Sequence, residues 1–162
     1  MIQAFVECYP DELFIRFLFN KVKKKGKIEH ARSKSRVIRK VSRYPKSFGL
    51  VDEDPGSAVP REFERMREIL NNQELKILAY EDINNHSRLL VLSPKFEDWL
   101  LRLCKLSKIA PEKFGLPKDP SALQKIINQR MNNLSKLLEE LYRSSRYLRK
   151  VIKTVNQLLL PL

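Results

Sequence analysis

The sequence lacks long apolar runs and low-complexity segments. None of its 162 residues falls in an uninterrupted apolar window of about 18 to 20 residues, the length that a membrane-spanning helix needs. The N-terminal stretch "MIQAFVECYPDE" has no basic residues ahead of its short apolar run, so we expect no secretory signal. These absences predict a cytoplasmic protein without a membrane partner.

Cysteine and histidine are scarce. The chain has two of each, Cys8, Cys104, His30 and His86, and they are widely separated. No CxxC, HxxxH or similar close pair is present, which excludes a zinc site built from neighbouring ligands. We expect both cysteines to be reduced thiols that fill positions in the core.

Positive charge is abundant. The chain has 32 Lys and Arg against 19 Asp and Glu, a net charge of +13. Between positions 21 and 46 twelve cations are opposed only by Glu29. Such charge favours nucleic acid as the partner, ahead of an acidic membrane surface or an acidic protein. A solvated face without a ligand is the other interpretation, because a charge run does not require phosphate.

Strand-like and helix-like segments alternate along the first 110 residues. We expect strands near 2–8, 27–30, 47–53, 75–80 and 88–93, and helices near 11–25, 34–43, 60–72 and 94–109. Ser33 or Ser35 is the expected N-cap of the second helix. The apolar residues of "SFGLVDE" run together instead of alternating, as in a strand covered on both faces. The pattern predicts an α/β fold with an open, mostly parallel, Rossmann-like sheet flanked by helices.

The chain changes character after the turn-rich "APEKFGLPKDPS". Residues 119–160 carry leucine, isoleucine and valine at helical spacing, with a break expected near Ser144 and Ser145. This amphipathic extension must bury its apolar stripe, either on the α/β domain of residues 1–110 or against a second copy of the chain. We favour packing within the chain, and a homodimer stays open.

Acidic residues follow two of the expected strands. Glu7 ends the first strand, and Asp52 and Asp54 end the third, with Glu53 facing the other way. If these strands are neighbours in a parallel sheet, about 4.8 Å apart, the side chains can converge on one cation. Mg²⁺ prefers such hard oxygen ligands. The alternative is a polar strand end in which Asp54, Pro55 and Gly56 form a turn.

Three segments together resemble a known family. "FVECYPDELFIRFL", "GLVDEDPG" and "LSPKFEDWLLRL" are similar to the Toprim domain of RloB-like and OLD-type nucleases, over roughly the first 110 residues. The resemblance implies a Toprim fold in which Glu7 acts as general acid or base, or as a metal ligand. It implies that Asp52 and Asp54 hold Mg²⁺ or Mn²⁺, with Glu97 as a further acidic member. Glu97 is alternatively an exposed acid favoured by its helix dipole.

The resemblance also places a phosphate-binding loop and helix start at "HARSKS", where backbone N–H groups and one cation can hold a phosphate. With the basic run around it, this predicts the following nucleic-acid contacts: Lys24, Lys25, Lys27, Arg32, Ser33, Lys34, Ser35 and Arg36.

These observations predict a Mg²⁺- or Mn²⁺-dependent nuclease. The alternative is a non-catalytic module that binds nucleic acid or protein. Cys8, where the family usually has glycine, favours the alternative, because cysteine adopts positive φ less readily. Retention of every carboxylate favours the enzyme. A separate ATPase partner stays open, and no base-reading motif distinguishes DNA from RNA.

Overall fold

The computed structural model describes residues 1–162, which form one mixed six-stranded sheet. Four neighbouring strands are parallel: β2 (Gly26–His30), β1 (Ile2–Val6), β3 (Phe48–Asp52) and β6 (Arg88–Leu92). The antiparallel strands β5 (Ile77–Asp82) and β4 (Met66–Asn72) extend the sheet beyond β6. The expected α/β fold with a mostly parallel sheet flanked by helices is confirmed.

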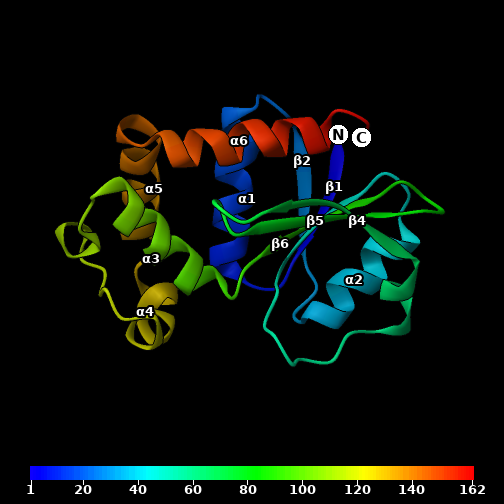
Figure 1. Cartoon of the computed structure of the whole chain (residues 1–162), viewed down its shortest axis with the longest axis horizontal. Helices are drawn as coiled ribbons and strands as arrows, with labels where there is room; N and C mark the ends of the chain where they lie inside the picture. The colour runs from blue at the N-terminus through cyan, green and yellow to red at the C-terminus, as the bar shows by residue number, and fades with distance from the viewer.

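Helices cover both faces of the sheet (Figure 1). The larger apolar cluster joins one face to α1 (Tyr9–Lys21), α3 (Phe96–Ser107), α5 (Met131–Ser144) and α6 (Arg146–Leu159), with the short α4 (Pro120–Ile126) beside them. The smaller cluster joins the other face to α2 (Lys34–Arg43). None of the helices combines the length and apolar composition that a membrane crossing requires.

Strand β3 lies at the centre of both clusters. Phe48 and Leu50 pack into the larger cluster, and Val51 packs into the smaller one. This explains the unbroken apolar run, since a strand buried on both faces has no solvent side for polar residues. The expectation of a doubly covered third strand is confirmed.

The order in which the chain adds strands to the sheet reverses at β1, because β2 and β3 lie on opposite sides of it. From β1 it passes through α1 to β2 on one side, and from β2 it returns through α2 to β3 on the other side of β1. The two connecting helices cover opposite faces. Such a switch point leaves a crevice at the carboxyl ends of the two strands, where open α/β sheets bind ligands.

The segment 60–72 differs from the sequence prediction of one helix. It forms a short 3₁₀ helix, η1 (Arg61–Arg65), followed by edge strand β4. Phe63, Met66 and Leu70 show the three- to four-residue spacing of a helix, but hydrogen bonding to β5 overrides that local preference. A register shift between Glu68 and Leu70 interrupts the strand's alternation, which removes the period-two signal that would have identified it.

The C-terminal helices pack within the chain. Leu137, Leu141, Val151 and Val155 are all completely buried in the larger cluster, together with α1 and the sheet. The expected break occurs at Ser145, whose hydroxyl accepts a hydrogen bond from Tyr147 N at 3.1 Å and so caps α6. The α5–α6 pair therefore acts as part of the layer that covers one face of the sheet.

The expectation that both cysteines fill the core is wrong for one of them. Cys104 is buried between α3 and its neighbours, whereas Cys8 is exposed in the turn between β1 and α1. Strand β1 ends at Val6, so Cys8 lies beyond it, in the turn that leads to α1. Connecting turns lie at the surface, which explains why the Cys8 side chain is exposed.

Candidate active site

The crevice between β1 and β3 collects acidic side chains from three elements. Glu7 follows β1, Asp52 ends β3, and Glu97 lies in the first turn of α3. Pairing between β1 and β3 ends at Phe5 and Gly49, so the last residues of the two strands are not held together by backbone hydrogen bonds. The carboxylates thus lie at the switch point of the sheet.

Asp52 links β3 to α3. Its Oδ1 accepts a hydrogen bond from Phe96 N at 3.0 Å, so the Asp52 side chain satisfies an N–H at the start of the helix. Phe96 is buried against Phe14 in the core, which fixes the helix start. This contact sets Glu97 in the same crevice as Asp52.

Asp11 is a further member that the sequence prediction did not include. It lies in the first turn of α1, is only 3% exposed, and accepts a hydrogen bond from the Cys8 thiol at 3.4 Å. An acidic residue in the first turn of a helix is ordinarily explained by the helix dipole, so its position in α1 alone does not mark Asp11 as a site residue. Its position four residues after Glu7, across a strand-to-helix turn, is the signal that could have identified it.

Burial and mutual repulsion raise the pKa values of two aspartates far above their ordinary range. Burial raises the pKa of Asp52 to about 8, with further contributions from the charges of Asp11, Glu7 and Glu97. Burial likewise raises the pKa of Asp11 to about 7, and the charge of Glu7 adds to the effect. Burial and neighbouring acids therefore disfavour the ionised forms of both aspartates, and such strongly raised pKa values are typical of functional sites.

Lys34 is the cation that acts on Glu7. Burial raises the pKa of Glu7, the ammonium of Lys34 opposes that shift, and the charges of Asp54 and Glu97 add to it. Lys34 Nζ donates hydrogen bonds to Glu53 O at 2.5 Å and to Ser57 Oγ at 3.1 Å. Lys34 thus fastens the loop after β3 beside the carboxylates.

Asp54 lies at the rim of the site. Its side chain is 47% exposed, and its carboxylate is 3.7 Å from Lys95 Nζ. The charge of Asp54 also contributes to the raised pKa of Glu7, so Asp54 acts on the site from its rim. Glu53 faces elsewhere and accepts a hydrogen bond from Ser93 Oγ at 2.7 Å. The expected alternation along a strand does not extend over these three acids, because β3 ends at Asp52 and Asp54 has a positive φ of 43°.

Cys8 does not distort the turn after Glu7. Its backbone is extended, with φ −148° and ψ 179°, a conformation open to any residue. The concern that cysteine in place of glycine shifts the turn is therefore not supported, because no positive φ is required there.

The predicted nucleic-acid contacts divide between the two ends of β2. Ser33 caps α2 by accepting a hydrogen bond from Arg36 N at 3.2 Å, and the segment from Arg32 to Arg36 lies beside the carboxyl end of β1. Lys24 and Lys25 precede β2 and lie at its amino end, away from the carboxylates, while Lys27 is exposed on the strand itself. Five residues of β2 span about 16 Å, so only the first group adjoins the carboxylates.

No group of three or more His, Cys, Asp or Glu side chains is arranged as a complete metal site. The donor set nevertheless suits Mg²⁺ or Mn²⁺, which commonly take one or two protein carboxylates and complete their shell with water and substrate phosphate. Asp52, Asp54 and Glu97 supply oxygen atoms only. Burial and neighbouring acids disfavour the ionised form of Asp52, the form that a bound cation would favour.

Comparisons with protein-family models, curated proteins and solved structures find no match to this chain.

Proposed function

We propose that the protein is a Mg²⁺- or Mn²⁺-dependent phosphoryl-transfer enzyme acting on nucleic acid, most specifically a small Toprim nuclease. The observation that carries this proposal is the group of mutually repelling, half-buried to buried carboxylates at the switch point of the sheet. Burying several acids side by side disfavours their ionised forms and opposes the stability of the folded chain, so the cluster favours a role in which a bound cation stabilises the carboxylates.

Each residue has a chemical role in this proposal. Asp52 and Asp54 would hold the cation, with Glu97 as a further oxygen donor, and the bound ion would stabilise charge developing on the phosphate. Glu7, whose burial raises its pKa, would accept or donate a proton. Lys34 and the N-terminal end of α2 would bind a phosphate oxygen.

A non-catalytic binding module on the same fold is the second candidate. The absence of a complete three-ligand group favours it. Cys8 does not favour it, since its extended backbone fits the turn as it is.

Cleavage of labelled single- and double-stranded DNA and RNA, with Mg²⁺ or Mn²⁺ and with EDTA, tests the proposal. We expect metal-dependent cleavage of at least one substrate by the wild type. Removing a positioned general acid or base slows reactions about 10²- to 10⁴-fold, and we expect Glu7→Gln to do so. Asp52→Asn should slow cleavage at least as much, although the Oδ1 of the asparagine can still accept the hydrogen bond from Phe96 N.

Asp119→Asn is the matched control. Asp119 also caps a helix, by accepting a hydrogen bond from Ala122 N at 2.9 Å, but it is exposed. Its charge is not among those that shift the pKa values of Glu7, Asp11, Asp52 or Glu97. It should cleave like the wild type. Absence of cleavage of every substrate by the wild type, with nucleic-acid binding retained, would support the binding module instead.

A further inference from the structure

A basic groove lies at the opposite end of α1 from the carboxylates. It encloses about 440 Å³ between the end of α1 and the outer side of α6. Its charged lining consists of cations alone: Lys21, Lys23, Arg149 and Lys153. We call this feature the α1–α6 groove.

Most of these cations have no carboxylate partner. Lys21 Nζ lies 3.0 Å from Glu139 and over the Tyr142 ring at 4.3 Å, so it forms part of the groove wall. Lys23, Arg149 and Lys153 are exposed and form no ion pair. Three guanidinium or ammonium groups are thus free to meet an external anion.

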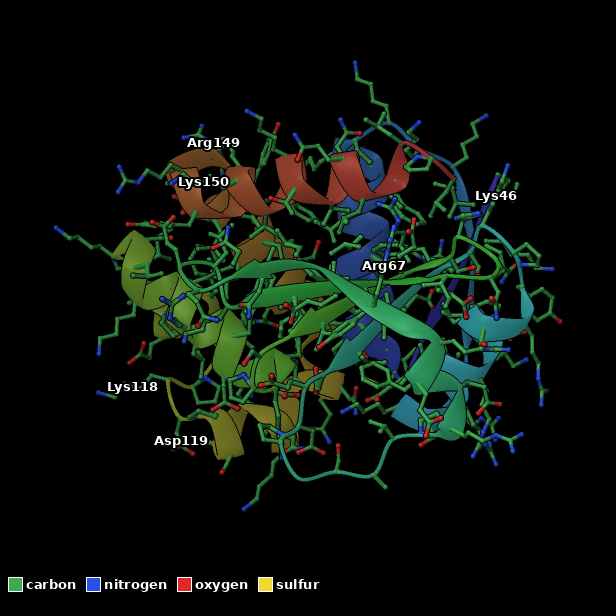
Figure 2. All side chains as sticks on the ribbon, turned by 45° about the vertical axis from the view of Figure 1, so that its right-hand side comes forward. Lys46, Arg67, Lys118, Asp119, Arg149 and Lys150 are labelled. Atoms are coloured by element: carbon green, nitrogen blue, oxygen red, sulfur yellow. The ribbon has the colours of Figure 1, made fainter.

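Helix α6 carries its cations where the helix itself disfavours them. Its 14 residues contain no Asp or Glu, and Arg146 and Arg149 stand in its first turn, next to the positive end of the helix dipole. Arg146 is compensated, since it donates a hydrogen bond to the Tyr147 hydroxyl at 3.2 Å, whereas Arg149 has no such partner. An unfavourable position without compensation, such as that of Arg149, is expected at a functional surface. Figure 2 shows Arg149 and Lys150 on this helix at the upper left of the view, above Lys118.

The burial of α6 distinguishes between an anionic membrane and nucleic acid as the partner of the groove. An amphipathic helix that binds membranes inserts its apolar face between lipids. In α6 the apolar face is already committed to the core, since Leu148, Val151 and Val155 are completely buried. Val22, Tyr142 and Ile152 also line the groove, but these side chains are half-buried or buried. The exposed groups of the groove are the cations Lys23, Arg149 and Lys153, which suit a sugar-phosphate backbone.

We propose that the α1–α6 groove binds the phosphate backbone of nucleic acid, as a second contact surface remote from the carboxylates. This inference rests on the proposed action on nucleic acid. The 13 residues of α1 separate the two regions by about 20 Å, the length of roughly six base pairs. Lys24 and Lys25 lie at the same end of the sheet as the groove, so they extend this surface.

Binding of a duplex of about 20 base pairs and of a single strand of equal length, measured in EDTA over a series of salt concentrations, tests the proposal. The variant is Arg149→Gln with Lys153→Gln. Each lost phosphate contact lowers the slope of log K against log salt by about 0.9 for duplex or about 0.7 for a single strand. We expect the slope to fall by about 1.8 or about 1.4, and affinity at 0.1 M salt to fall on the order of 25- to 60-fold.

Lys113→Gln with Lys118→Gln is the control, because it removes the same charge from two exposed, unpaired lysines that do not line the groove. The proposal is overturned if the control lowers the slope equally, or if the wild type binds no nucleic acid. It is also overturned if the groove variant loses binding to vesicles of anionic lipid while its nucleic-acid binding is unchanged.

The binding experiment contains no metal, so its result is separate from cleavage. A reduced slope in a protein that never cleaves would support the groove and contradict the nuclease. Cleavage with an unchanged slope would support the nuclease and contradict the groove.

Discussion

The surroundings of Asp52 act on its protonation in two opposite ways. The hydrogen bond from Phe96 N favours the carboxylate, whereas burial and the neighbouring acids favour the protonated form and prevail. Because the pKa of Asp52 in the folded chain lies above its unfolded value, the unfolded chain loses this proton at lower pH. The stability that the proton confers is complete below about pH 4 and is lost as pH rises to about 8.

The free energy of unfolding of the metal-free protein should therefore fall between pH 5 and pH 8. We expect a decline of at least about 1 kcal/mol, since one pKa unit corresponds to about 1.4 kcal/mol. Asp52→Asn should show a smaller decline, because one ionisation is removed and its neighbours repel less. Urea unfolding at both pH values measures this, with Asp119→Asn as control. An identical decline in Asp52→Asn and the wild type would contradict the pKa assignment.

Lys34 should set the lower limit of the active pH range. Its ammonium lowers the pKa of Glu7, so Lys34→Gln lets that pKa rise further. If Glu7 acts as a base, the rise in kcat/KM with pH should then begin at higher pH. A pH profile of cleavage measures the shift, and Arg36→Gln, which removes an exposed neighbouring cation, should leave the profile in place. An unmoved profile for Lys34→Gln would exclude this role.

At the scale of elements, the junction between α5 and α6 depends on one buried hydroxyl. Ser145 is 2% exposed, caps α6 through Tyr147 N, and lies with its Oγ 2.5 Å from Ser107 Oγ. Ser145→Ala removes the cap and leaves Ser107 without this partner. We expect a loss of about 1 to 2 kcal/mol in the free energy of unfolding.

Urea denaturation measures this loss. Ser135→Ala is the control, because Ser135 is exposed within α5 and alanine favours a helix interior. Its stability should be equal to the wild type or slightly higher. A Ser145→Ala protein as stable as the wild type would show that the junction is held by packing alone.

The elements also show where sequence patterns were sufficient. The doubly buried β3 and the break at Ser145 follow from local signals: an unbroken apolar run and a pair of serines. Strand β4 could not be predicted, because its apolar residues straddle a 3₁₀ helix and a register shift. This segment is a strand because it pairs with β5, and the local spacing of its apolar residues does not reveal that contact.

At the scale of the whole molecule, charge is divided between two ends of the sheet. The basic run 21–46 is continuous in sequence, but β2 separates its first lysines from the segment 32–36. The carboxylate site was predictable because Glu7 and Asp52 follow strands that are neighbours. Two features could not be predicted from the sequence. The role of Asp11 depends on its burial, and the α1–α6 groove depends on how α6 crosses the end of α1 (Figure 1).

Titration with Mn²⁺ at pH 7, followed by calorimetry in buffers of different ionisation enthalpy, tests the central claim most directly. A cation that displaces protons from carboxyl groups releases them to the buffer. Because the pKa of Asp52 is about 8 and that of Asp11 about 7, we expect binding with release of about one proton. Asp52→Asn should lose both binding and release, and Asp119→Asn should keep them. No binding by the wild type, or binding that Asp52→Asn leaves unchanged, would contradict the account.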